Sequence, residues 1–259
     1  MPPPPSALAA LRAEIAALER GVRPASAVIA FGDARVDALL PGGGLALGAW
    51  HEFAGEGLEL ETAAASAAFV ARLAAPLTAR GELVWVLRRD DLHAPGLAGL
   101  GFPAERLIQV CAPGEAEALA VMEDALRTRG VAAVFAEVGE VDLTAGRRLQ
   151  LACEQGSATG FVLRRRPFGG AGQAAASSAA ASRWRLAPAP SEPAPGDLGL
   201  GAPRWRVTLE RCRGGRTGAW ILEANPPPWE DDDAAHPFRL VAELADRDVA
   251  AQARLKLVG

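Results

Sequence analysis

Hydrophobic residues recur along the chain in two patterns that predict alternating strands and helices. Mainly apolar runs, which are typical of strands buried in a sheet, occupy 50–54, 83–87, 106–110, 131–138 and 159–163. Between these runs, apolar residues three or four positions apart predict helices at 62–75, 115–127 and 143–155. This alternation predicts an α/β fold with a mainly parallel sheet and crossover helices.

A different pattern follows residue 163. The segment 164–182 begins with three arginines and continues mostly in Ala, Ser and Gly, which predicts a mobile loop. Apolar and polar residues then alternate with period two, which predicts antiparallel strands with one exposed face. These strands are expected at 183–186, 204–211 and 217–223, joined by an exposed Pro- and Gly-rich connector, 188–203.

The two ends of the chain are expected to form separate elements. Residues 1–23 are predicted to be an arm with a helix that is capped by Ser6. Its apolar stripe can pack on its own domain or on a neighbouring subunit, and the pattern leaves both open. The stripe consists of Leu8, Leu11, Ile15 and Leu18.

Residues 226–259 read as an acidic linker followed by a second helix, from Phe238 to about Leu255. Three prolines and four consecutive acids keep the segment extended. The helix either docks on a partner or packs on its own sheet. The domain proper is then 24–225.

Composition narrows the range of functions. The 259 residues, half of them apolar, can bury one substantial core. A net charge of −4 disfavours bulk attraction to nucleic acid, so any contact with DNA needs a local basic patch. Lys256 is the only lysine among 27 basic residues. A phosphate-binding lysine in the body of the protein is therefore excluded.

Cysteine and histidine usage indicates no disulfide framework and no metal site. The three cysteines, Cys111, Cys153 and Cys212, include no C-x-x-C pair, which favours a reducing cytoplasm. The three histidines lie far apart in sequence, which favours structural roles. We found neither a signal peptide pattern nor an unbroken apolar run of about 18 residues, so a cytoplasmic protein without a membrane segment is expected.

The stretch 48–62 has the layout of a nucleotide-binding loop without its chemistry. A strand, a glycine-bearing loop and a helix follow one another, as in the phosphate-binding pattern G-x-x-x-x-G-K-[ST]. Gly55 and Thr62 match this pattern, and Gly57 lies inside the loop. Leu60 replaces the second glycine and Glu61 replaces the lysine, so a carboxylate would repel a triphosphate. We therefore expect no ATPase activity and no cofactor.

Four stretches together resemble the ImuA family of RecA-like and SulA-like damage-inducible mutagenesis proteins. They are 28–55, which is similar to the entry into the core of RecA-type recombinases, and 83–96, 136–152 and 204–216. The similarity covers roughly residues 6–223. It implies a RecA-like P-loop-type core with a mainly parallel sheet, antiparallel C-terminal strands, and N- and C-terminal helices. It also places Glu137 at the end of a core strand, where an ATPase has an acidic residue.

The resemblance implies a non-catalytic adaptor in SOS-induced translesion DNA synthesis. Its expected partners are an ImuB-like polymerase homologue, RecA and a DnaE-like error-prone polymerase. Two other functions are open: a divergent DNA-dependent ATPase, and a SulA-like inhibitor of a polymerising protein.

Single-stranded DNA is a further expected ligand. In the recombinases, the loop that corresponds to 164–182 faces single-stranded DNA. Arg164, Arg165 and Arg166 can neutralise phosphates there, and Phe168 can stack on a base. Ordinary solvated charge is the alternative interpretation of these arginines.

Overall fold

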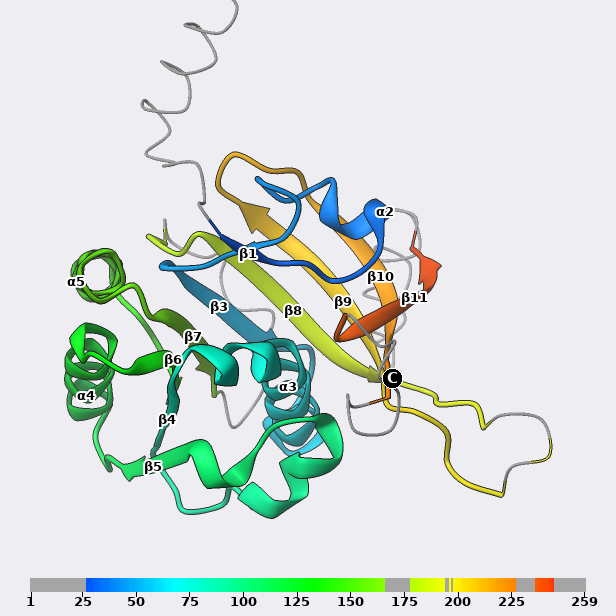
Figure 1. Cartoon of the computed structure of the whole chain (residues 1–259), viewed down its shortest axis with the longest axis horizontal. Helices are drawn as coiled ribbons and strands as arrows, with labels where there is room; N and C mark the ends of the chain where they lie inside the picture. The colour runs from blue at the N-terminus through cyan, green and yellow to red at the C-terminus, as the bar shows by residue number, and fades with distance from the viewer. Residues whose placement is uncertain (1–26, 166–177, 194–195, 197, 227–235, 245–259) are drawn as a thin grey trace, which may run out of the picture.

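A large sheet forms the centre of the molecule. The computed structural model describes residues 27–165, 178–193, 196, 198–226 and 236–244. Within them, nine strands pair in the order β11-β10-β9-β8-β3-β7-β6-β4-β5 (Figure 1). The strands are β3 (Trp50–Gly55), β4 (Glu82–Leu87), β5 (Leu107–Cys111), β6 (Val131–Val138), β7 (Thr159–Arg164), β8 (Ser182–Ala189), β9 (Arg204–Cys212), β10 (Gly218–Ala224) and β11 (Phe238–Glu243).

The sheet joins a parallel part to an antiparallel part. The neighbours from β8 through β3, β7, β6 and β4 to β5 are all parallel. β8, β9, β10 and β11 pair antiparallel. A mainly parallel sheet with antiparallel C-terminal strands is thus confirmed. A two-stranded ribbon, β1 (Val28–Ile29) with β2 (Leu45–Ala46), precedes β3.

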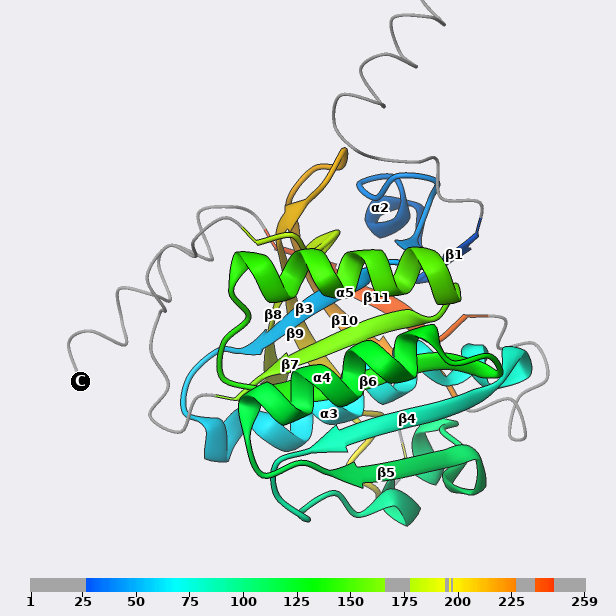
Figure 2. The ribbon, with the colours of Figure 1, turned by 90° about the vertical axis from the view of Figure 1, so that its left-hand side faces the viewer.

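Helices cover the sheet from both sides. Figure 2 shows α4 (Glu115–Arg127) and α5 (Leu143–Gly156) in front of the sheet and α3 (Glu59–Ala74) behind it. The short helices α2 (Ala34–Asp37), η1 (Ala75–Arg80), η2 (Ala94–Leu100) and η3 (Ala104–Arg106) complete the described helical segments. The bounds of α4 and β6 agree with the sequence prediction. α3 begins three residues earlier than predicted.

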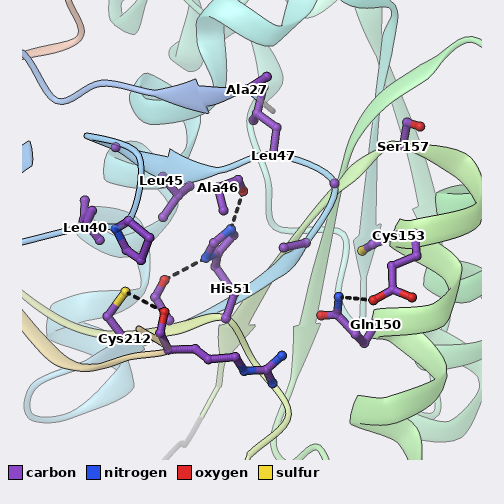
Figure 3. A pocket seen from close by; sticks show the side chains of 18 of the residues that line it. Ala27, Leu40, Leu45, Ala46, Leu47, His51, Gln150, Cys153, Ser157 and Cys212 are labelled. Carbon is purple, nitrogen blue, oxygen red and sulfur yellow. Dashed lines mark hydrogen bonds between the residues drawn. The ribbon is translucent and has the colours of Figure 1, made fainter. Parts of the chain in front are cut away.

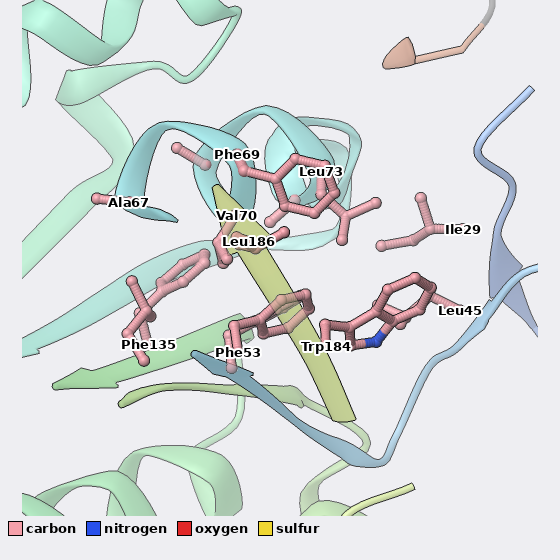
Figure 4. Close-up of a cluster of buried hydrophobic side chains, with 14 of the residues drawn as sticks. Ile29, Leu45, Phe53, Ala67, Phe69, Val70, Leu73, Phe135, Trp184 and Leu186 are labelled. Carbon is pink, nitrogen blue, oxygen red and sulfur yellow. The ribbon is translucent and has the colours of Figure 1, made fainter. Parts of the chain in front are cut away.

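Aromatic side chains form a row across the α3 side of the sheet. Trp85 stacks on Phe135, and Phe135 stacks on Phe161, with ring centroids 4.6 and 5.0 Å apart. Phe53 continues the row to Trp184 at 6.1 Å. Figure 4 shows Phe53, Phe135 and Trp184 among the side chains of α3. Stacked aromatic pairs on neighbouring strands fix strand register, because a one-residue slip would turn every ring to the other face.

The helical stretch 59–80 is long and apolar enough to match a membrane span by length and composition alone. Most of it is buried inside the fold, and its buried residues include Phe69, Val70 and Leu73. Its apolar composition is therefore explained by its position against the sheet.

The C-terminal prediction is wrong over residues 238–243, which form strand β11 rather than a helix. Phe238 is buried and stacks on Phe69 with centroids 4.7 Å apart, so this strand belongs to the core. A helix would separate Phe238 from Leu240, whereas period two places both on the buried face of the sheet. The predicted arm helix, the acidic residues 230–233 and the rest of the terminal helix lie outside the described residues.

The guanidinium of Arg72 holds the start of β11 in place. It donates hydrogen bonds to the carbonyl oxygens of Pro226 and Pro237, each at 3.0 Å, and of Leu100 at 3.2 Å. Arg72 is buried on α3, and this burial lowers the pKa of its guanidinium. Helix α3 and the C-terminal strand are thus tied by one side chain.

Candidate functional site

The loop between β3 and α3 is only three residues long. β3 ends at Gly55 and α3 begins at Glu59, so Leu60, Glu61 and Thr62 lie in the first turns of the helix. Gly57 has a φ of 113°, a conformation that favours glycine. The strand–loop–helix order predicted from the sequence is present, and β3 lies between β7 and β8 in the sheet.

The threonine at the end of the pattern is engaged within its own helix. The Thr62 hydroxyl donates to the Leu58 carbonyl at 3.0 Å and is buried. A Cβ added to Gly55 would lie 2.1 Å from Thr62 Oγ1, so glycine is required for this close packing. Leu60 is 95% exposed, and Glu61 is exposed beside it. The first turn of α3 therefore presents a leucine and a carboxylate where the pattern has glycine and lysine.

Arginine–carboxylate pairs line the carboxyl edge of the parallel strands. Carboxyl ends of parallel strands meet at one edge, which is where ligands bind in open α/β sheets. We call the following set the carboxyl-edge ion pairs: Arg88–Glu115, Arg89–Glu59, Arg164–Glu52, Arg165–Glu137 and Arg206–Glu56.

One of these pairs involves the carboxylate at the end of β6. Arg165 donates two hydrogen bonds to Glu137, at 2.9 and 2.6 Å, and the indole of Trp85 donates a third at 3.1 Å. The Glu137 side chain is 3% exposed and that of Arg165 is 12% exposed. An arginine of the same chain therefore neutralises this buried carboxylate.

A second buried carboxylate, Glu52 on β3, lies on the α4 and α5 side. Arg164 contacts it at 2.5 Å and Arg183 at 3.3 Å, and the Ser178 hydroxyl donates at 3.2 Å. Arg164 also donates to the Gly139 carbonyl at 2.6 Å. Arg164 and Ser178, which lie toward the two ends of the segment 164–182, thus contact the same buried carboxylate.

Of the four residues predicted to contact DNA, the structure describes Arg164 and Arg165. The side chain of Arg164 is 7% exposed, and both Arg164 and Arg165 are bonded to carboxylates rather than free for phosphates. Arg166 and Phe168 lie outside the described residues. The sequence held one signal of these pairs, because a glutamate inside the buried strand 50–54 requires a buried partner.

The amino edge of the parallel strands, opposite the carboxyl edge, holds a pocket of about 330 Å³ (Figure 3). His51 lies at its wall and is buried. Its Nε2–H donates to the Ala46 carbonyl at 2.8 Å, and its Nδ1 accepts from the Ser182 hydroxyl at 2.7 Å. The Ser182 oxygen in turn accepts from the indole of Trp184 at 2.6 Å. This assignment uses every hydrogen bond of a neutral imidazole.

The buried imidazole predicts a loss of stability in mild acid. Burial lowers the pKa of His51 to about 4, although the bond to Ala46 acts in the opposite direction. In the unfolded chain the pKa returns to about 6.5, so the unfolded state gains a proton first as pH falls. Stability is complete above pH 6.5 and is lost toward pH 4, by up to about 3 kcal/mol from this residue.

The check is to measure the melting temperature of the wild type and of His51→Gln at several pH values from 7 to 4.5. Glutamine cannot titrate, so the variant should lose less stability across this range, whatever its value at pH 7. Parallel losses in the two proteins would contradict this role for His51.

Among the described residues, no group of three or more His, Cys, Asp or Glu side chains is arranged to hold a metal ion. His51, His93 and His236 belong to different segments, at β3, before η2 and before β11. Cys153 is buried, and this burial raises the pKa of its thiol to about 12. Such a thiol stays protonated and unreactive.

The described residues thus form an α/β protein with a central strand–loop–helix unit whose surrounding arginines are paired with the protein's own carboxylates. Protein ImuA of Caulobacter vibrioides is 60% identical over 240 residues, which cover 90% of this chain and 97% of that protein. Protein ImuA of a second strain of the same species matches equally well. This chain belongs to the ImuA family, and the family resemblance found in the sequence is confirmed. No protein-family model matches the chain.

Proposed function

We propose that this chain is a non-catalytic, RecA-like adaptor in SOS-induced translesion DNA synthesis. Membership of the ImuA family supports a role in damage-induced mutagenesis. The central position of β3, with a loop and helix after it, supports descent from a nucleotide-binding core. The observation that carries the non-catalytic role is the set of carboxyl-edge ion pairs, which neutralises the arginines nearest to the degenerate loop.

Phosphoryl transfer depends on positioned positive charge, since the protein supplies little covalent chemistry. A triphosphate at this edge would meet the exposed Glu61 and would have to compete with Glu59 for Arg89. It would also have to displace Arg165 from Glu137 before that carboxylate could hold a metal ion. Each displacement leaves a buried charge unpaired, which is strongly unfavourable.

We expect the purified protein to show no ATPase activity, with or without single-stranded DNA. Turnover should stay far below about 1 per second, the lower end of ordinary enzymes. The measurement is phosphate release, with Thr62→Ala as the matched variant. Turnover of ordinary size that Thr62→Ala abolishes would establish the divergent ATPase instead. The double variant Leu60→Gly with Glu61→Lys tests whether the loop can regain nucleotide binding.

The proposed partners are an ImuB-like polymerase homologue, RecA and a DnaE-like error-prone polymerase. Affinity purification of the chain from cells after DNA damage tests this directly. Recovery of the polymerase homologue supports the adaptor. Recovery of a cell-division polymer without any polymerase would favour a SulA-like inhibitor.

Single-stranded DNA remains a proposed ligand of the segment 164–182. Arg166 and Phe168 are the candidates to test first, because Arg164 and Arg165 are engaged in buried ion pairs. Absence of binding at low salt, where phosphate contacts are strongest, would end this part of the proposal.

A further inference from the structure

A groove runs along one side of α5. The pocket of about 330 Å³ at the amino edge adjoins a second hollow of about 420 Å³, and both are lined by Gln150 and Arg213. The lining residues of α5 extend from Leu143 to Glu154, and Ser157 directly after the helix also lines the groove, so the groove follows the length of the helix. Its other wall includes Ser178 and Ala179, just before β8.

Helix α5 carries two exposed leucines outside the side that packs on the sheet. Gly146, Leu149 and Ala152 are buried. Leu143 and Leu151 line the groove instead, and they are 44% and 53% exposed. The two leucines are eight positions apart, about 12 Å along the helix, and Arg147 lies between them in the lining of the groove. They offer an apolar segment two contact points, and the aliphatic stem of Arg147 can be covered with them.

The chain itself enters at this groove. Ala27, the first described residue, lines the pocket together with Leu47 and Ser157 (Figure 3). The sequence before it predicts a helix over residues 6–20 with an apolar stripe. Such a helix would be about 22 Å long, and the 14 residues of α5 span about 21 Å. The connector 21–26 reaches at most about 20 Å, which is enough to lay one helix beside the other.

We propose that the groove along α5 is the docking site of residues 6–20 of the same chain. Because the connector is short, the segment has a high effective concentration at the groove. Docking within one molecule is therefore favoured over docking of a segment from another molecule. The apolar stripe of this segment would cover Leu143 and Leu151. This answers the question that the sequence left open, in favour of the segment's own domain.

The test uses three variants of the full chain: Ile15→Asp in the segment, Leu151→Asp in the groove, and Leu198→Asp as the control. Leu198 lies on the β8–β9 connector and is fully exposed. We expect each of the first two to lower the melting temperature by about 2–5 °C and to speed amide hydrogen exchange in α5 about tenfold. The double variant should be little worse than either single one, because both break the same contact. The control should change neither quantity.

Two results would overturn the proposal. One is an Ile15→Asp protein with unchanged melting temperature and unchanged exchange in α5. The other is a wild-type dimer, seen by light scattering, that Ile15→Asp dissociates, because the segment would then dock on a second copy.

Discussion

Removing all residues after Asn225 is expected to unfold the protein or to leave it barely stable. The truncation deletes β11 and leaves the edge of β10 that pairs with it without a partner. It also deletes Phe238, whose ring packs on Phe69, Phe31 and Trp205. Loss of a buried phenylalanine side chain alone costs about 3–5 kcal/mol, comparable to the 5–15 kcal/mol that stabilises a typical domain. Arg72 would further lose two of its three carbonyl partners.

A second truncation, after Leu244, serves as the matched control. It keeps all nine strands that the structure describes in the large sheet and removes only 245–259, so we expect the melting temperature to change little. Circular dichroism on heating measures both proteins. If the shorter chain melted like the wild type, the assignment of β11 to the core would be wrong.

The same pair of proteins refines the question of partner docking. If residues 245–259 bind the polymerase homologue, truncation after Leu244 should abolish co-purification without loss of stability. Retained co-purification would move the partner surface elsewhere on the chain.

Replacing Arg165 by alanine is expected to cost about 3–5 kcal/mol, because Glu137 would be left buried without a counter-charge. Arg185→Ala is the control. Arg185 also pairs with a glutamate, Glu210, but both side chains are 28% exposed, and such pairs contribute about 0–1 kcal/mol. Urea denaturation measures both free energies of unfolding.

A double variant isolates the cause of the loss. Arg165→Ala with Glu137→Gln removes the stranded charge but keeps an acceptor for Trp85, so part of the stability should return. If Arg165→Ala and Arg185→Ala lowered the free energy of unfolding equally, the buried pair would contribute no more to stability than the exposed one. The result also bears on DNA binding, since replacing all three arginines 164–166 together would weaken the fold as well as the candidate DNA contact.

The parallel strands could be predicted because each is a compact apolar run whose type depends on local pattern. Strand 131–138 and helix 115–127 illustrate this, since both match the structure in bounds. Residues 238–243 were misassigned because a short segment with Leu240, Val241 and Leu244 satisfies a helical spacing as well as a strand spacing. Only the packing of Phe238 against distant side chains decides between them.

The charged site could be predicted only in part. Gly55 and Thr62 fit the sequence pattern, and the structure brings them into contact. The pairing of Arg164 with Glu52 joins residues 112 positions apart, and no local pattern encodes such a distance. Runs of arginine look the same in sequence whether they face solvent or a buried carboxylate.

The position of β3 has a consequence for how the protein is made. β3 pairs only with β7 and β8 within the sheet, so both of its edges stay open until β7, which ends at Arg164, has left the ribosome, and the second edge waits for β8, which ends at Ala189. At ordinary rates of synthesis this delay is on the order of ten seconds. During it, the nascent chain carries an apolar strand with unpaired amides and carbonyls on both sides, which is a template for aggregation. Chaperone demand should therefore peak in the middle of translation, and nascent chains stalled before β7 should be the most prone to aggregate.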